Sequence, residues 1–216
     1  MRIEGLKIAF LGDSITEGVG VSIPDNIYHQ VLKKNTNLKE AYNYGIGGTR
    51  IARQSIPSKD PNYDKYFATR IDDMEHDCDV VVVFGGTNDY GHGDAPFGNF
   101  DDRRDDTFCG ALHLFLQKLI TKYPDKQIVF LTPLHCMEDT KPSRKPDGNY
   151  ILKDYVDAIC KVCEYYSVPV LNLYAVSGMN PNVESQHQLY FPDGLHPSDK
   201  GHKRIAEKLE NFLKTL

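Results

Sequence analysis

The chain has 216 residues, of which 40% are hydrophobic and 25% charged, and its formal net charge is −5. This length suits one domain with a sizeable buried core, so we predict a single domain over residues 1–216. The slightly acidic balance argues against nucleic-acid binding, which usually needs a basic surface, and no apolar run approaches the roughly 20 residues of a membrane span.

The N-terminal residues Met1–Gly5 precede a strand-like run directly. They lack the longer apolar segment and the small-residue cleavage site of a secretory signal. We therefore expect a cytoplasmic protein.

Short apolar runs rich in β-branched residues alternate with segments of helical periodicity. The apolar runs predict strands over Leu6–Leu11, Ala41–Tyr44, Val80–Phe84, Gln127–Leu131 and Val168–Leu173. The periodic segments predict helices over Asn26–Asn35, Tyr63–Glu75, Asp105–Tyr123, Tyr150–Tyr166 and Ser198–Leu216. A near-continuous apolar strand such as Val80–Phe84 indicates burial on both faces, as in a parallel sheet. The alternation therefore predicts an α/β fold in which helices cover both sides of an open sheet.

The first predicted strand runs into the segment Gly12–Gly18, in which Ser14 follows a glycine and an aspartate. Glycine permits the sharp turn that would present a serine hydroxyl at the end of a strand. The nucleophile motif G-x-S-x-G of α/β-hydrolases does not fit, because Thr16 occupies the position of its second glycine. Taken alone, this segment is also compatible with an ordinary turn.

Polar and glycine-rich segments also follow the second and third predicted strands. The glycines of Asn43–Thr49 would let a backbone N–H approach a ligand, although an ordinary glycine turn is equally compatible with them. In Gly85–Asp89 the side-chain amide of Asn88 is a second potential donor to a developing negative charge.

Near the C-terminus, Asp193 precedes His196 by three residues, just before the last predicted helix. This spacing would let the carboxylate reach the imidazole ring and select its tautomer. Because acids are also common where helices begin, Asp193 could instead cap that helix.

Two long stretches, Tyr90–Arg104 and Pro133–Asn149, follow the ends of the third and fourth predicted strands. In open α/β sheets this edge holds the ligand crevice, so the stretches are either binding loops or lids, or plain surface loops. Their histidines, His92 and His135, either contact substrate or have no special role.

Taken together, four of these segments resemble, in the right order, the four sequence blocks of the SGNH hydrolases, also called GDSL esterases. They are Gly12-Asp13-Ser14, Asn43 to Gly48, Gly86-Thr87-Asn88-Asp89 and Asp193-Gly194-Leu195-His196-Pro197. The resemblance implies a three-layer α/β/α sandwich with five parallel strands in flavodoxin-like order.

The resemblance also implies the roles of particular residues. Ser14 would be the nucleophile, His196 the general base and acid, and Asp193 the residue that orients His196. The oxyanion hole would consist of the backbone N–H groups of Ser14 and Gly48 and the side chain of Asn88. Neither a metal ion nor an organic cofactor is required by this chemistry.

The family acts on many esters and thioesters, so the resemblance does not name a substrate. The polar character of the predicted loops favours a small acyl group, most simply acetyl, that is esterified to a small molecule or a carbohydrate. We predict Asp13, Asp89, Tyr90 and His135 as further contacts to such a substrate. The alternatives are a lipase or thioesterase for longer acyl chains, and a non-catalytic module that binds a carbohydrate or nucleotide.

Overall fold

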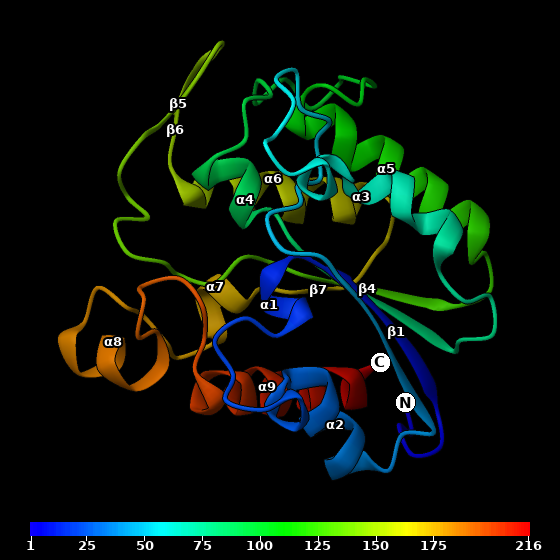
Figure 1. Ribbon diagram of the computed structural model, residues 1–216. Helices are drawn as coiled ribbons and strands as arrows, with labels where there is room; N and C mark the ends of the chain where they lie inside the picture. Colours follow the sequence, from blue (N-terminus) through cyan, green and yellow to red (C-terminus); the bar gives the residue numbers. More distant parts are fainter.

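The computed structural model describes residues 1–216, and a single parallel sheet runs through its centre (Figure 1). The strands of this sheet are β1 (Lys7–Gly12), β2 (Glu40–Gly45), β3 (Val80–Phe84), β4 (Gln127–Leu131) and β7 (Val170–Leu171). All five are parallel, and they lie in the order β2-β1-β3-β4-β7. This arrangement confirms the predicted α/β fold and its flavodoxin-like strand order.

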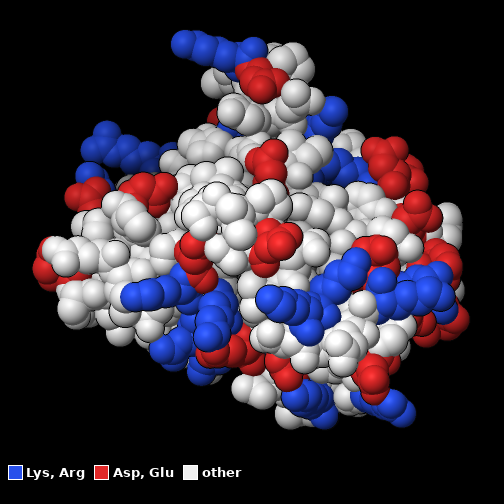
Figure 2. All heavy atoms as spheres, turned by 60° about the horizontal axis from the view of Figure 1, so that its bottom comes forward, with Lys and Arg blue, Asp and Glu red and all other residues white.

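Helices cover both faces of the sheet. They are α1 (Ser14–Glu17), α2 (Tyr28–Thr36), α3 (Phe67–Arg70), α4 (Thr87–Gly91), α5 (Phe108–Lys122), α6 (Leu152–Tyr165), α7 (Leu173–Val176), α8 (Glu184–Tyr190) and α9 (Asp199–Thr215). Helices α2 and α9 pack against each other on one face, whereas α3, α5 and α6 lie on the other (Figure 1). Toward the α2 and α9 side, Lys and Arg side chains are interspersed with Asp and Glu (Figure 2).

The central strand β3 explains why the apolar run Val80–Phe84 is continuous. Val81 and Val83 belong to the apolar cluster under α5 and α6, whereas Val80 and Val82 belong to the cluster under α2 and α9. Because successive side chains of a strand point to opposite faces, a strand covered on both sides needs apolar residues at every position.

One predicted helix, Tyr63–Glu75, is wrong. The chain forms a 3₁₀ turn over Pro61–Asp64, then α3, and then a second 3₁₀ turn over Ile71–Asp73. The turns are closed by local backbone bonds, but other backbone groups in this stretch bond to distant parts of the chain and do not continue one helix. The Phe67 N–H donates to the Arg50 carbonyl at 3.0 Å, and the Lys122 ammonium binds the Ile71 carbonyl at 2.6 Å.

Other element boundaries also differ from the predictions. A 3₁₀ turn over Pro24–Asn26 precedes α2. The last strand is short because the side chain of Asn172 accepts the Ala175 N–H and begins α7. The predicted loop Pro133–Asn149 contains most of a hairpin, β5 (Ser143–Lys145) and β6 (Gly148–Tyr150), that projects from the body (Figure 1). No helix combines the length and the apolarity needed to cross a membrane.

The order of the strands determines where a ligand can bind. From β1 the chain continues to the neighbouring β2 on one side, and β3 and β4 then follow on the other side of β1. In open α/β sheets the crevice lies at this reversal, outside the carboxyl ends of the strands. The segments after β1, β2 and β3 therefore meet at one edge.

Candidate active site

A cavity of about 680 Å³ lies at this edge of the sheet. Its volume is within the range typical of sites for small molecules. The residues that line it are Ser14, Glu17, Val19, Ile46, Gly47, Gly48, Asp60, Asn62, Tyr63, Asn88, His92, Leu195 and His196.

Ser14, His196 and Asp193 form a continuous row of hydrogen bonds at the cavity. The Ser14 hydroxyl lies 3.0 Å from Nε2 of His196, and Nδ1 of His196 lies 2.6 Å from Oδ2 of Asp193. Because a carboxylate can only accept, Nδ1 carries the proton and Nε2 can accept the proton of the Ser14 hydroxyl. The arrangement has the geometry of a nucleophile, its base and a group that orients the base.

A tight turn holds Asp193 and His196 in this arrangement. The second carboxylate oxygen of Asp193 accepts the backbone N–H groups of Leu195 at 2.9 Å and of His196 at 2.7 Å. Gly194, between them, has φ of 82°, a left-handed conformation that glycine adopts without strain. Asp193 does not cap α9, because the N-cap is Ser198, whose hydroxyl accepts the Gly201 N–H at 3.4 Å.

The same hydrogen bonds set the charge of Asp193. Partial burial acts to raise the pKa of its carboxyl group, but the hydrogen bonds from His196 and Leu195 outweigh it and hold the pKa below its usual range. Asp193 is therefore ionised at neutral pH and can stabilise a positively charged imidazole.

Three N–H donors without an acceptor in the protein belong to residues that line the cavity. The Gly47 N–H is already bound to the Glu17 carboxylate at 2.8 Å, whereas the N–H groups of Gly48 and Ser14 have no acceptor in the protein. The Asn88 amide donates one N–H to the Thr49 carbonyl at 2.9 Å, which leaves its second N–H free. Since all three residues line one cavity, their free donors could bind a single oxyanion.

Asp13 and Asp89, which we predicted as contacts to substrate, are buried and do not line the cavity. The Asp13 carboxylate caps α1 by accepting the Ile15 N–H at 3.0 Å. The Asp89 carboxylate accepts the N–H groups of Ile51 and Ala52, at 3.0 and 2.9 Å. Burial raises the pKa of each carboxyl group to about 6. Both residues thus shape the segments around the site.

Tyr90 and His135, the other two predicted contacts to substrate, also lie outside the cavity lining. The Tyr90 hydroxyl donates to the carbonyls of Glu138 and Lys141, at 3.1 and 2.8 Å. His135 is hydrogen-bonded to Asp139, and its ring lies 3.7 Å from that of Tyr174. The Tyr90 hydroxyl and Nδ1 of His135 are therefore bound to groups of the protein itself.

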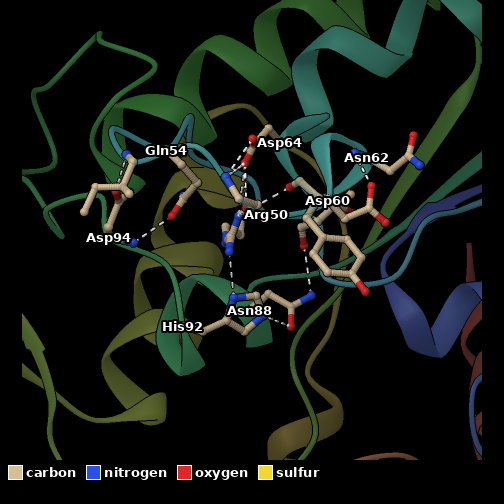
Figure 3. A network of polar contacts seen from close by, with 12 residues as sticks. Arg50, Gln54, Asp60, Asn62, Asp64, Asn88, His92 and Asp94 are labelled. Atoms are coloured by element: carbon tan, nitrogen blue, oxygen red, sulfur yellow. Dashed lines mark hydrogen bonds and ion pairs between the residues drawn. The ribbon is translucent and has the colours of Figure 1, made fainter.

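The structure adds a wall to the cavity that the predicted site residues did not include. It consists of Asp60, Asn62 and Tyr63, from the segment between β2 and β3, together with Glu17 of α1 (Figure 3 shows Asp60 and Asn62). The available signal was the run of turn-forming residues Ser58–Asp64 after the second strand, at the same sheet edge.

Hydrogen bonds to a distant aspartate and to one within the segment hold this wall in place. The Asp94 carboxylate accepts the N–H groups of Ser55 and Ile56, at 3.0 and 2.6 Å. The Asp64 carboxylate accepts the N–H and the hydroxyl of Ser58, with a shortest distance of 2.7 Å. His92, whose role the sequence left open, lies on the cavity beside Asn88 (Figure 3).

Comparison with known proteins places the chain among ester hydrolases. The model of the GDSL-like lipase/acylhydrolase family matches residues 10–204. An acetylxylan esterase of Xylanibacter ruminicola is 24% identical over 225 residues, covering 98% of this chain and 44% of that protein. The chain thus spans less than half the length of this relative.

Two crystal structures show the same fold. A protein from Lactobacillus plantarum is 35% identical, with a TM-score of 0.83 and coverage of 99% of this chain and 98% of that one. A two-domain esterase active on acetylated mannans, crystallised with mannopentaose, is 22% identical, with a TM-score of 0.63 over 99% of this chain and 50% of that one. Because the family match covers most of its length, the chain belongs to the GDSL-like lipase/acylhydrolase family, the SGNH hydrolases.

Proposed function

We propose that the protein removes short acyl groups, chiefly acetyl, from neutral carbohydrates, with Ser14 as nucleophile and His196 as base. The observation that carries this proposal is the hydrogen-bonded row from Ser14 through His196 to Asp193, at a cavity with three unpaired N–H donors.

The reaction follows from this geometry. As Ser14 Oγ bonds to the carbonyl carbon, Nε2 of His196 takes the hydroxyl proton, and Asp193 stabilises the imidazolium that results. The donors of Ser14, Gly48 and Asn88 bind the oxyanion of the tetrahedral intermediate. When the intermediate collapses, the bond to the alcohol breaks and His196 gives its proton to the leaving oxygen. Water then attacks the acyl-enzyme with His196 again as base, which releases the acid and restores Ser14.

The lining of the cavity supports a short acyl group. Its aliphatic side chains are limited to Val19, Ile46 and Leu195, and the remaining lining is mostly polar. A long acyl chain would need a continuous apolar surface to leave water favourably. A lipase or thioesterase for long chains is therefore the weaker alternative.

The wall opposite the triad supports a neutral sugar as the alcohol part. The ring of Tyr63 is 43% exposed at the cavity, and such a ring can cover the apolar face of a sugar. Glu17, Asp60 and Asn62 offer acceptors for hydroxyl groups, and the lining includes no lysine or arginine to pair with an anionic sugar. Acetylated xylan and acetylated mannan are the substrates named for the two esterases described above.

The proposed substrate class can be tested with a panel of esters. We expect kcat/KM to fall steadily from p-nitrophenyl acetate to the palmitate, and acetylated neutral oligosaccharides to be deacetylated faster than acetylated uronic acids. The carboxylates of Glu17 and Asp60 disfavour an anionic sugar by about 1 kcal/mol, or roughly fivefold, at a separation of about 4 Å in water. A preference for palmitate, or for the anionic sugars, would contradict the proposal.

A substitution in the wall can distinguish recognition of the sugar from recognition of the acyl group in this panel. Tyr63→Ala should raise KM for acetylated oligosaccharides and leave p-nitrophenyl acetate within about threefold, because only the sugar needs the ring. Tyr165→Ala is the matched control, since that ring is 60% exposed and lies outside the cavity lining. Equal losses on both substrates would place Tyr63 in support of the catalytic groups rather than in contact with sugar.

The nucleophile can be identified by labelling. A fluorophosphonate should modify Ser14 and no other serine, because only Ser14 has a histidine base at hydrogen-bond distance. Mass spectrometry locates the label. Ser14→Ala should lose labelling completely, whereas Ser55→Ala, a change in the nearby loop, should keep it. A label on a different serine in the wild-type protein would remove Ser14 from the mechanism.

A further inference from the structure

We infer that His92 is a positioning residue for the oxyanion donor Asn88, and that Arg50 holds His92 in the tautomer that this task requires. The inference rests on the proposed function, because it assumes that the Asn88 amide binds the oxyanion.

A chain of hydrogen bonds links the three side chains (Figure 3). Nη2 of Arg50 lies 2.7 Å from Nδ1 of His92, and Nε2 of His92 lies 3.0 Å from Oδ1 of Asn88. A guanidinium group can only donate, so Nδ1 of His92 must accept and its proton must be on Nε2. Nε2 then donates to Oδ1 of Asn88.

This chain determines which way the Asn88 amide faces. With Oδ1 bound to His92 and one N–H bound to the Thr49 carbonyl, the second N–H is the only polar group of the side chain left for the cavity. An amide held from both ends needs no reorientation when the oxyanion forms, which is the property that makes such a donor effective.

The donors of the chain all point in one direction, from the Arg50 cation through His92 and Asn88 toward the cavity. Hydrogen bonds arranged head to tail polarise one another, so each strengthens the next. The positive charge of Arg50 is thereby felt at the free N–H of Asn88, where negative charge develops during the reaction.

Arg50 is itself firmly held. Its side chain is 8% exposed, and Nη1 lies 3.3 Å from both the Ser58 hydroxyl and the Tyr63 carbonyl. The Asp64 carboxylate lies 3.8 Å away. The same guanidinium therefore connects the cavity wall with the oxyanion donor.

The surroundings of His92 keep its ring neutral. Partial burial of the ring in a residue that is otherwise exposed, followed by the nearby charges of Arg50 and Lys145, holds the pKa of His92 below its usual range. The carboxylates of Asp64 and Asp89 interact with the same cations and partly balance them. A protonated ring would direct an N–H at the guanidinium and break the chain, so neutrality is what the proposed role requires.

Two substitutions of His92 test the inference. His92→Leu removes the donor and should lower kcat about 10–50-fold with little change in KM, a part of the 10²–10³ that a whole oxyanion donor is worth. His92→Gln can still accept from Arg50 and donate to Asn88, so it should restore most of kcat. His76→Leu, at an exposed histidine outside the cavity lining, is the control. If His92→Leu lowers the melting temperature, His92→Ala, which also lacks a donor, takes its place.

A double-mutant cycle shows whether His92 acts through Asn88. Adding His92→Leu to Asn88→Ala should slow the reaction by no more than about threefold further, because the group it positions is already gone. Losses that multiply, or a rise in KM in place of a fall in kcat, would show an independent role and overturn the inference. If Asn88→Ala alone has normal kcat, the proposed oxyanion hole fails. If Asn88→Ala is slow but His92→Leu is not, only the present inference fails.

Discussion

Replacing His196 with alanine should lower kcat by about 10⁴–10⁶, with only a small change in KM. Nε2 of His196 is the group at hydrogen-bond distance from the Ser14 hydroxyl, and in both steps of the proposed reaction a proton passes through it. Without this base a neutral serine hydroxyl is a poor nucleophile. Steady-state and single-turnover kinetics on p-nitrophenyl acetate measure the loss.

Asp193 provides the matched comparison, because its two carboxylate oxygens have separate tasks. One accepts the N–H groups of Leu195 and His196, and the other accepts Nδ1–H of His196. Asp193→Asn can keep the turn but offers Nδ1 an amide N–H, which favours the tautomer with the proton on Nε2. That tautomer cannot accept a proton from Ser14, so kcat should fall about 10²–10⁴-fold while the melting temperature changes little.

These outcomes distinguish a catalytic role from a structural one. If Asp193 served only the turn, Asp193→Asn would remain active and Asp193→Ala would mainly lower the melting temperature. A His196→Ala enzyme with near wild-type turnover would contradict the whole mechanism.

Replacing Asn88 with alanine should lower kcat by about 10²–10³ and leave KM within a few-fold. In the proposed reaction the free N–H of the Asn88 amide binds charge that exists only near the transition state, so its loss should affect turnover more than binding. Asn88→Asp, nearly identical in shape, should be at least as slow, because a carboxylate repels the oxyanion. The measurement is kcat and KM for both variants on the same acetyl ester.

A change confined to KM would instead make Asn88 a residue that binds the ground state. Equal activity of Asn88→Asp and the wild type would show that no donor is needed at this position. Asn149→Ala, at an exposed position on β6, controls for unspecific effects of removing an amide.

Much of this arrangement follows from the order of short segments along the chain. The carboxyl ends of parallel strands lie at one edge, so residues that directly follow β1, β2 and β3 must come close together. Ser14, Gly48 and Asn88 occupy such positions, and local spacing alone lets Asp193 reach His196. The continuous apolar run of β3 likewise indicated a sheet covered on both faces, as the structure confirms.

The sequence alone therefore predicts the fold class, the edge of the sheet where the cavity lies, and part of the cavity lining, namely Ser14, Gly48, Asn88 and His196. Which of the side chains at the strand ends line the cavity and which are buried could be read only from the tertiary structure. Asp13 and Asp89 also follow the ends of β1 and β3, yet both are buried, because their carboxylates accept hydrogen bonds from nearby backbone N–H groups.

The wall of the cavity depended on contacts that no local pattern contains. Tyr63 was expected inside a helix, but long-range bonds from Asp94 and Arg50 fold its segment over the site instead. The link between His92 and Arg50 joins residues 42 positions apart. Hydrophobic periodicity indicates which face of a helix or strand is buried. It does not indicate hydrogen bonds between distant loops, because these form only once the sheet has brought the loops together.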